Sequence, residues 1–304
     1  MNDTLRWTFK LILIVVVVVF VIYRLRASYP DNKNPVTDPP DGAAFQFVRD
    51  RPWVRMKIGS ITHWALFDTG ATFSTISRDW LKRADAKFLG MTNTNGVLGS
   101  SQLQWATVKD IEFAHRIFQY QQVASSSSST SVLGASIIFQ LPHLLLSKQG
   151  LSYGTPINNA DSRIVECMAV TMDRNGQNSE VTAAYLHMNI NGTVQPVLLD
   201  TGAAFLLVGT ASDLPKEDML LEIPRYNLFQ GNGGSYGFVK YYSRTAKVSV
   251  GDVLFDTNYK SFPSLSRNGV KYYLGASILD RFDIYIDYQQ GRACFLKRDE
   301  KIAH

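Results

Sequence analysis

The chain has 304 residues, of which 45% are hydrophobic and 19% are charged, and its formal net charge is +5. This composition is typical of a folded globular protein and excludes general disorder, and the length suffices for two lobes with a small additional element. Lysines and arginines are scattered along the chain instead of clustering on one element, so we expect no nucleic acid among its partners.

An apolar segment lies near the N-terminus. Residues 11–23 are uninterruptedly apolar, and two aromatic residues before them extend the segment to about 17 residues, the lower end of the length that crosses a bilayer. Two arginines follow without a convincing small-x-small cleavage pattern, which favours an uncleaved signal anchor over a cleaved signal peptide. Residues 1–26 are therefore expected to form a single transmembrane helix that meets the lipid bilayer through residues 7–23. We expect the body of the chain on the extracytoplasmic side, periplasmic or luminal.

Residues 27–44 are polar and contain four prolines. Such a segment buries little apolar surface, and its prolines keep it extended. We expect a tether that holds the folded body away from the membrane.

The tripeptide Asp-Thr-Gly occurs twice, at residues 68–70 and 200–202, each time after apolar residues and before alanine. Two chance copies would occur in roughly one chain in several hundred at average residue frequencies. The flanks match as well: a methionine lies twelve residues before each aspartate, and Leu-Gly-Ala-Ser-Ile recurs at 133–137 and 274–278. Because the repeat is too long for a solenoid, it predicts two duplicated lobes. The expected lobes are residues 45–157 and residues 158–304.

Alternating apolar residues predict a mostly β body. Each Asp-Thr-Gly ends the second strand of a predicted hairpin, and the Asn-Gly pair at residues 191–192 is a strong turn signal between two such strands. The run of serines at 125–129 is expected to be a surface loop or the approach to an edge strand. The predicted strands are residues 54–58, 61–67, 164–171, 186–190, 193–199, 238–250, 284–288 and 293–297.

Neither cysteines nor histidines form a metal-binding motif. Cys167 and Cys294 are far apart in sequence and belong to no Cys-x-x-Cys pattern, and none of the five histidines lies in a zinc-binding motif. We therefore expect no metal and no cofactor. A disulfide between the two cysteines is compatible with an exported body, and buried free thiols are at least as compatible with their apolar surroundings.

The two motifs and their matched flanks resemble the pepsin and retropepsin superfamily of aspartic proteases, over about residues 45–297. The resemblance implies an all-β, bilobal acid-protease fold with two duplicated β-barrel-like lobes on one chain, so that the active site does not require dimerisation. It implies that Asp68 and Asp200 are the catalytic pair and that the partner is a peptide or protein substrate. Residues implied in supporting roles are Thr69, Gly70, Thr201 and Gly202 beside the pair, and Gly96, Val97, Leu98, Gly99 and Tyr236 in two substrate-covering flaps. Pepsin-like flaps usually carry a tyrosine, and residues 96–99 lack one, which leaves the placement of the first flap open.

Two adjacent carboxylates share one proton, so one of them activates a water while the other hydrogen-bonds the scissile carbonyl. The predicted function is thus a membrane-anchored aspartic endopeptidase. A catalytically silent peptide-binding descendant and a protease that processes its own tether are the alternatives. Ala71 and Ala203 lack the hydroxyl that many pepsins place after the motif, which predicts a less acidic activity optimum than that of gastric-type pepsins.

Overall fold

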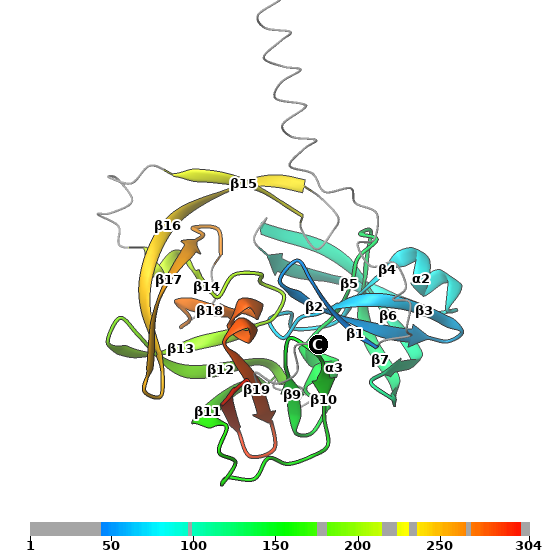
Figure 1. The fold of residues 1–304 in the computed structure, drawn as a ribbon. Helices are drawn as coiled ribbons and strands as arrows, with labels where there is room; N and C mark the ends of the chain where they lie inside the picture. The colour runs from blue at the N-terminus through cyan, green and yellow to red at the C-terminus, as the bar shows by residue number, and fades with distance from the viewer. Residues whose placement is uncertain are drawn as a thin grey trace, which may run out of the picture. The chain divides into compact units, whose positions relative to one another are not determined.

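The protein body is built almost entirely from β-strands. The computed structural model describes residues 44–96, 99–174, 181–214, 224–230, 236–265 and 269–298, and within them the strands form one sheet of eight and one of twelve (Figure 1). The described helices are short: α2 (Arg78–Arg83), α3 (Ala135–Ile138), and the 3₁₀ turns η1 (Ala211–Asp213) and η3 (Ala276–Asp280). This architecture confirms the predicted all-β class.

The predicted anchor, residues 1–26, and all but the last residue of the predicted tether, 27–44, lie outside the described residues. Among the residues that are described, no helix has the length and apolar character needed to cross a membrane.

The first sheet has the strand order β1-β2-β3-β8-β4-β7-β6-β5, and an additional β2–β6 pairing joins two strands that are distant in that order. Its strands are β1 (Phe45–Val48), β2 (Arg51–Ile58), β3 (Ile61–Phe67), β4 (Thr75–Ser77), β5 (Lys87–Gly96), β6 (Gly99–Phe113), β7 (Arg116–Ser126) and β8 (Ser131–Leu133).

The second sheet has the order β10-β9-β19-β20-β11-β12-β13-β18-β14-β17-β16-β15, with an additional β12–β16 pairing. Its strands are β9 (Leu144–Leu146), β10 (Leu151–Ser152), β11 (Ile164–Arg174), β12 (Val181–Ile190), β13 (Thr193–Asp200), β14 (Leu207–Gly209), β15 (Arg225–Gln230), β16 (Tyr236–Val250), β17 (Val253–Ser261), β18 (Tyr272–Gly275), β19 (Phe282–Asp287) and β20 (Arg292–Lys297). In Figure 1 the long strand β16 curves around β17 and β14.

The two sheets repeat one arrangement of strands. Hairpins β2–β3 and β12–β13 end immediately before or at the two aspartates, as predicted, and the second one turns through Asn191 and Gly192, which both have positive φ. Strand β8 then pairs in parallel with β3, and β18 pairs in parallel with β13. The repeated sequence therefore corresponds to a repeated topology.

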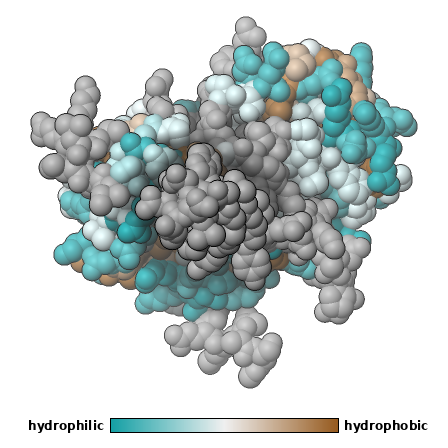
Figure 2. Space-filling model, turned by 90° about the horizontal axis from the view of Figure 1, so that it is seen from above, coloured by the Kyte–Doolittle hydropathy of each residue, from teal (hydrophilic) through white to brown (hydrophobic). Residues whose placement is uncertain are grey.

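The matched residues of the sequence repeat are core positions. Met56, Met188, Ile58 and Ile190 are all at most 1% exposed and belong to one large apolar cluster that both sheets share. Shortening such a side chain to alanine commonly costs about 2–5 kcal/mol. Packing therefore explains why these flanking residues match between the two halves. At the surface, the face in Figure 2 is mostly hydrophilic or neutral where residues are described, with smaller hydrophobic patches.

The serine run was expected to be a surface loop or the approach to an edge strand, and this prediction is wrong for Ser125 and Ser126. Ser125 and Ser126 end strand β7, where they are 7% and 1% exposed. They lie between two neighbours in the sheet, because β7 pairs with β4 on one side and with β6 on the other. A small hydroxyl side chain fits this interior position, and strand pairing between distant segments is invisible in local composition.

Cys167 and Cys294 form a disulfide. They lie directly opposite each other on the antiparallel strands β11 and β20, with Cα atoms 4.0 Å apart. Of the two alternatives that the sequence left open, the structure selects the disulfide over free thiols.

Strands β9 and β10 belong to the second sheet although they precede the predicted lobe junction. Strand β9 pairs with β19, and β10 pairs only with β9 among the described strands. A segment that follows the first Asp-Thr-Gly unit in sequence thereby contributes to the sheet of the second unit.

Candidate active site

Each Asp-Thr-Gly loop is held by the backbone of a second segment of its own half. In the first half the Asp68 amide donates to the Leu133 carbonyl (2.9 Å), and the Ala135 amide donates to the carbonyl of Ala71 (2.8 Å). In the second half Asp200 pairs with Gly275, and the Ala276 amide donates to the Ala203 carbonyl (2.7 Å). The two Leu-Gly-Ala-Ser-Ile segments thus cross and fix the two loops in the same way.

The threonines of the motifs connect the loops to each other. The Thr69 hydroxyl donates to the Leu199 carbonyl (2.9 Å), and the Thr201 hydroxyl donates to the Phe67 carbonyl (2.6 Å). The Thr69 amide donates to the Thr201 hydroxyl, and the Thr201 amide donates to the Thr69 hydroxyl, both at 3.1 Å. Both threonines are fully buried. Four reciprocal hydrogen bonds therefore join the two halves.

These contacts bring the carboxyl groups of Asp68 and Asp200 within hydrogen-bonding distance of each other. A Cβ atom placed on Gly70 would lie 2.5 Å from Cγ of Asp200, and one placed on Gly202 would collide with the carboxylate of Asp68. Glycine is therefore required at both positions, because any side chain would occupy the space of the opposite carboxyl group. Both aspartates remain partly exposed, so solvent reaches them.

Backbone amides orient the two side chains. The amides of Gly70 and Ala71 donate to Oδ1 of Asp68 at 2.9 and 3.0 Å, and the Ala203 amide donates to Oδ1 of Asp200 at 3.2 Å. Oδ1 of each aspartate thus accepts hydrogen bonds from its own loop, and the two carboxyl groups also hydrogen-bond each other.

The environment makes the pair retain a proton. Burial raises the pKa of Asp68, and the hydrogen bond from Asp200 opposes that rise. Burial, followed by the negative charge of Asp68, raises the pKa of Asp200 well above its ordinary value. Two carboxyl groups this close titrate as one unit, so the pair holds a single proton in mildly acidic solution.

Arg51 is a charged residue near the pair that sequence reasoning missed. In the β2–β3 hairpin Trp53 lies opposite Leu66, so two residues further along the same register Arg51 falls opposite Asp68. Its positive charge lowers the pKa of both Asp68 and Asp200, although less than burial raises them. The signal was present in the sequence, because the predicted hairpin register already implies this juxtaposition.

The predicted flap residues lie at the ends of two hairpins. Gly96 and Gly99 pair with each other at the end of β5–β6, and Val97 and Leu98 between them lie outside the described residues. In the second half the backbone of Tyr236 pairs with Gln230 at the end of β15–β16. Both segments thus follow long paired strands, as hairpin flaps do.

The two halves differ in what surrounds the phenylalanine five residues after each aspartate. Phe73 packs on Trp105 of β6, with ring centroids 4.8 Å apart. Phe205 instead lies under the ammonium group of Lys260 on β17, 4.4 Å from the ring centroid. Trp105 and Lys260 were not identified from sequence.

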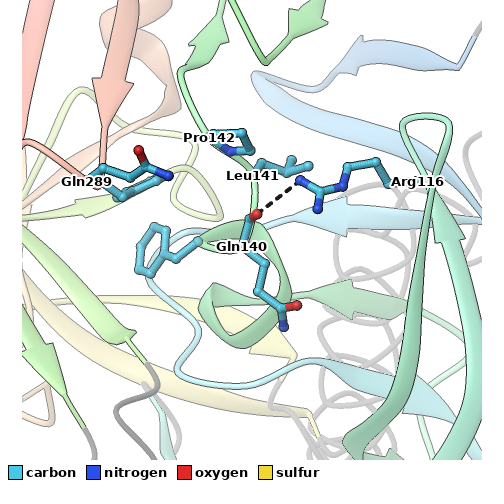
Figure 3. A pocket seen from close by; sticks show the side chains of 7 residues that line it. Arg116, Gln140, Leu141, Pro142 and Gln289 are labelled. Carbon is cyan, nitrogen blue, oxygen red and sulfur yellow. Dashed lines mark hydrogen bonds between the residues drawn. The ribbon is translucent and has the colours of Figure 1, made fainter.

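A separate cavity of about 200 Å³ lies away from the aspartate loops. Figure 3 shows it between Arg116 at the start of β7, the segment after α3 and Gln289 near the β19–β20 turn. Its seven lining residues include no lysine, aspartate or glutamate. The Arg116 guanidinium donates a hydrogen bond to the Gln140 carbonyl at 3.3 Å. This cavity contains none of the predicted site residues.

Comparison with known proteins finds a family similar to part of the chain and a solved structure with a similar fold. A family model described as retroviral aspartyl protease matches residues 48–145. The crystal structure of an aspartic proteinase from Irpex lacteus has the same fold, with a TM-score of 0.52 and 13% sequence identity, and the match covers 86% of this chain and 98% of that one. A search of curated protein sequences gave no match.

The chain is therefore similar to aspartic proteases of the pepsin/retropepsin superfamily, in sequence over residues 48–145 and in fold over most of its length. The family match falls on the first half of the body, and the fold match extends over both halves.

Replacing Thr69 by valine should destabilise the protein by about 2–3 kcal/mol, because the Thr201 amide and the Leu199 carbonyl both lose their buried partner. Thr69→Ser keeps the hydroxyl and is the matched control, with a smaller loss. Urea unfolding of the full-length variants measures the difference. Equal stability of the valine and serine variants would show that these hydrogen bonds do not hold the loops together.

Proposed function

We propose that this protein is an aspartic endopeptidase in which Asp68 and Asp200 activate a water molecule for direct attack on a peptide bond. The observation that carries the proposal is the mutual approach of the two loops, in which each glycine lies against the carboxyl group of the opposite half. Capping a strand does not require contact between two carboxyl groups, and their contact costs free energy because the ionised forms repel each other.

The reaction follows from a pair that holds one proton. The ionised carboxylate removes a proton from the water, whose oxygen forms a bond to the carbonyl carbon, while the protonated carboxyl group donates its proton to the carbonyl oxygen. The tetrahedral gem-diol intermediate then collapses: the C–N bond breaks, the amine nitrogen receives a proton from the pair, one gem-diol hydroxyl gives its proton back to the pair as the C=O bond re-forms, and a carboxylic acid and an amine leave. The singly protonated pair is restored, and no covalent acyl-enzyme forms.

The surrounding structure supports this chemistry in two ways. The reciprocal threonine bonds fix the spacing of the carboxyl groups, so the water-binding geometry exists before the substrate arrives. The hairpins β5–β6 and β15–β16 supply two segments suited to closing over an extended peptide. Both halves come from one chain, so one copy suffices for the proposed site.

We further propose that residues 1–26 anchor the protein in a membrane and leave its body on the extracytoplasmic side. The apolar run of residues 11–23 supports the anchor. The Cys167–Cys294 disulfide supports the location, because such bonds persist mainly in oxidising compartments.

Asp68→Asn and Asp200→Asn should each lower peptide cleavage by at least about a thousandfold, the scale of lost acid–base catalysis. Asp252→Asn, at an exposed turn between β16 and β17, is the matched control and should leave cleavage unchanged. Mass spectrometry of a peptide library digested by the full-length protein measures the rates. Substantial cleavage by either site variant, or none by the unmodified protein, would contradict the proposal. Loss of a shortened mature form in the same variants would identify self-processing.

Arg51→Gln should move both limbs of the pH profile of kcat/KM to higher pH. Arg51 lowers the pKa of Asp68 and Asp200, so its removal raises both ionisations of the pair, and the singly protonated form then exists at higher pH. Arg55→Gln, on the same strand, is the control. An unchanged profile would show that Arg51 does not act on the pair, and an optimum of the unmodified enzyme below about pH 3 would contradict the expected effect of Ala71 and Ala203.

Deleting residues 1–26 should release the protein from membranes. Alkaline carbonate does not extract a protein whose apolar segment spans the bilayer, whereas it removes a peripheral protein from the membrane. The measurement is the share of protein in the membrane pellet after carbonate washing, for the full-length and the truncated chain. Extraction of the full-length chain would refute the anchor.

A further inference from the structure

A basic pocket of about 620 Å³ lies in the second half, beside the loop that carries Asp200. Its wall includes Phe205 of that loop, Arg225 of β15, Ser243 and Arg244 of β16, and Lys260 of β17. Three of its eight lining residues are cations and none is an acid. In Figure 1 the strands β15, β16 and β17 that carry the three cations lie together on one side of the second sheet.

One residue of the pocket wall, Phe205, packs on the face of the sheet to which the Asp200 side chain belongs. Side chains alternate along β13, so Leu198 and Asp200 lie on the same face. Leu198 belongs to an apolar cluster against which Phe205 and Tyr241 also pack. Phe205 is, moreover, only five residues after Asp200, and its carbonyl lies against Gly275, the residue paired with Asp200. Phe205 thus belongs both to the pocket wall and to the segment that follows Asp200.

Lys260 is held with its charge over two aromatic rings. Its Nζ atom lies 4.4 Å from the centroid of Phe205 and 4.7 Å from that of Tyr241. The carboxylate of Asp213, in the turn η1, accepts hydrogen bonds from the hydroxyls of Tyr259 (2.9 Å) and Ser261. Partial burial lowers the pKa of Lys260, since no carboxylate compensates for the loss of water. An incoming anion would supply the charge partner that the ammonium group lacks among the described residues.

The first half shows that the cation is not a requirement of the fold. Ile76 and Val208 each lie eight residues after the aspartate of their half, and they pair with Ser125 and Lys260 respectively. The first half thus has a buried serine where the second half has a lysine, and it has Trp105 packed on Phe73. The lysine, its aromatic platform and the nearby arginines are a feature of one side of the site only.

We propose that the basic pocket binds the carboxylate of an aspartate or glutamate residue of the substrate, a few residues from the scissile bond. The proposal deepens the proposed function and rests on it. The carboxylate accepts a charge-assisted hydrogen bond from Lys260, while the exposed Arg225, which lies opposite Tyr241, adds an attractive field. The protein is accordingly a protease selective for peptides that are acidic on the side bound by the second half.

The test compares peptides that differ at one position. Peptides built around a bond that the full-length protein cleaves carry Glu, Gln or Lys at each of the three positions on either side of that bond. At one position kcat/KM should be about tenfold higher for Glu than for Gln, the effect of one charge-assisted hydrogen bond. Lys260→Gln should bring that ratio near one, and Lys260→Glu should favour Lys. Lys247→Gln, an exposed lysine on β16 outside the pocket, should retain the preference.

A binding measurement separates this inference from the proposed function. The full-length Asp200→Asn protein should bind labelled Glu peptides more tightly than Gln peptides by fluorescence anisotropy, and Lys260→Gln in that background should abolish the difference. If no peptide is cleaved but this difference is found, the proposed function fails and the pocket inference stands. If peptides are cleaved without any Glu preference, the inference is overturned and the proposed function stands. Competition by inorganic phosphate without a Glu preference would indicate a site for free anions and would equally overturn it.

Discussion

The reciprocal hydrogen bonds between Thr69 and Thr201 are the constraint on which the candidate site depends. Two carboxyl groups at contact distance repel when both ionise, so the folded structure must hold them there against that repulsion. The threonine hydroxyls bond to the carbonyls of Phe67 and Leu199, the residues immediately before the two aspartates, and thereby join the ends of strands β3 and β13. Since the bonds are buried, breaking one leaves polar groups without water, which costs more than the bond gains when it forms. The same hydrogen bonds thus stabilise the folded body and hold the two carboxyl groups in position.

The arrangement is built from a few short sequence segments, each of which occurs once in each half. Each half contributes the same loop, the same crossing Leu-Gly segment and the same buried methionine and isoleucine anchors. The glycines at 70 and 202 complete it, because each removes the one side chain that would keep the opposite carboxyl group away. Substitution of the glycine in one half would therefore displace the carboxyl group of the other half.

The sequence was sufficient for features that depend on local pattern. The hairpins, their Asn-Gly turn and the position of each aspartate at a strand end follow from alternation and turn chemistry over about ten residues. It was insufficient where distant segments meet. Ser125 and Ser126 are buried because β7 pairs with β4 and β6, and the disulfide forms because β11 and β20 are neighbours in a sheet whose order no local pattern encodes. Lys260 was missed for the same reason, since only the β14–β17 pairing and the turn after Asp200 bring it to Phe205. Arg51 is different, because hairpin register alone would have placed it.

The halves share a backbone arrangement but differ in the charges near the site. Extending the hairpin registers by two residues places Arg51 opposite Asp68, and the same step in the second half places the buried Ala183 opposite Asp200. Ser125 and Lys260 form a second unequal pair. A symmetric dimer would present every charge twice, and a peptide would bind it equally well in either direction. A single chain is free of that restriction: cations at different positions in its two halves would make the two directions of an acidic peptide unequal in energy. In the proposed function, the asymmetry of the charges would thus set the direction of the substrate, while the symmetry of the loops would keep the two carboxyl groups equivalent in position.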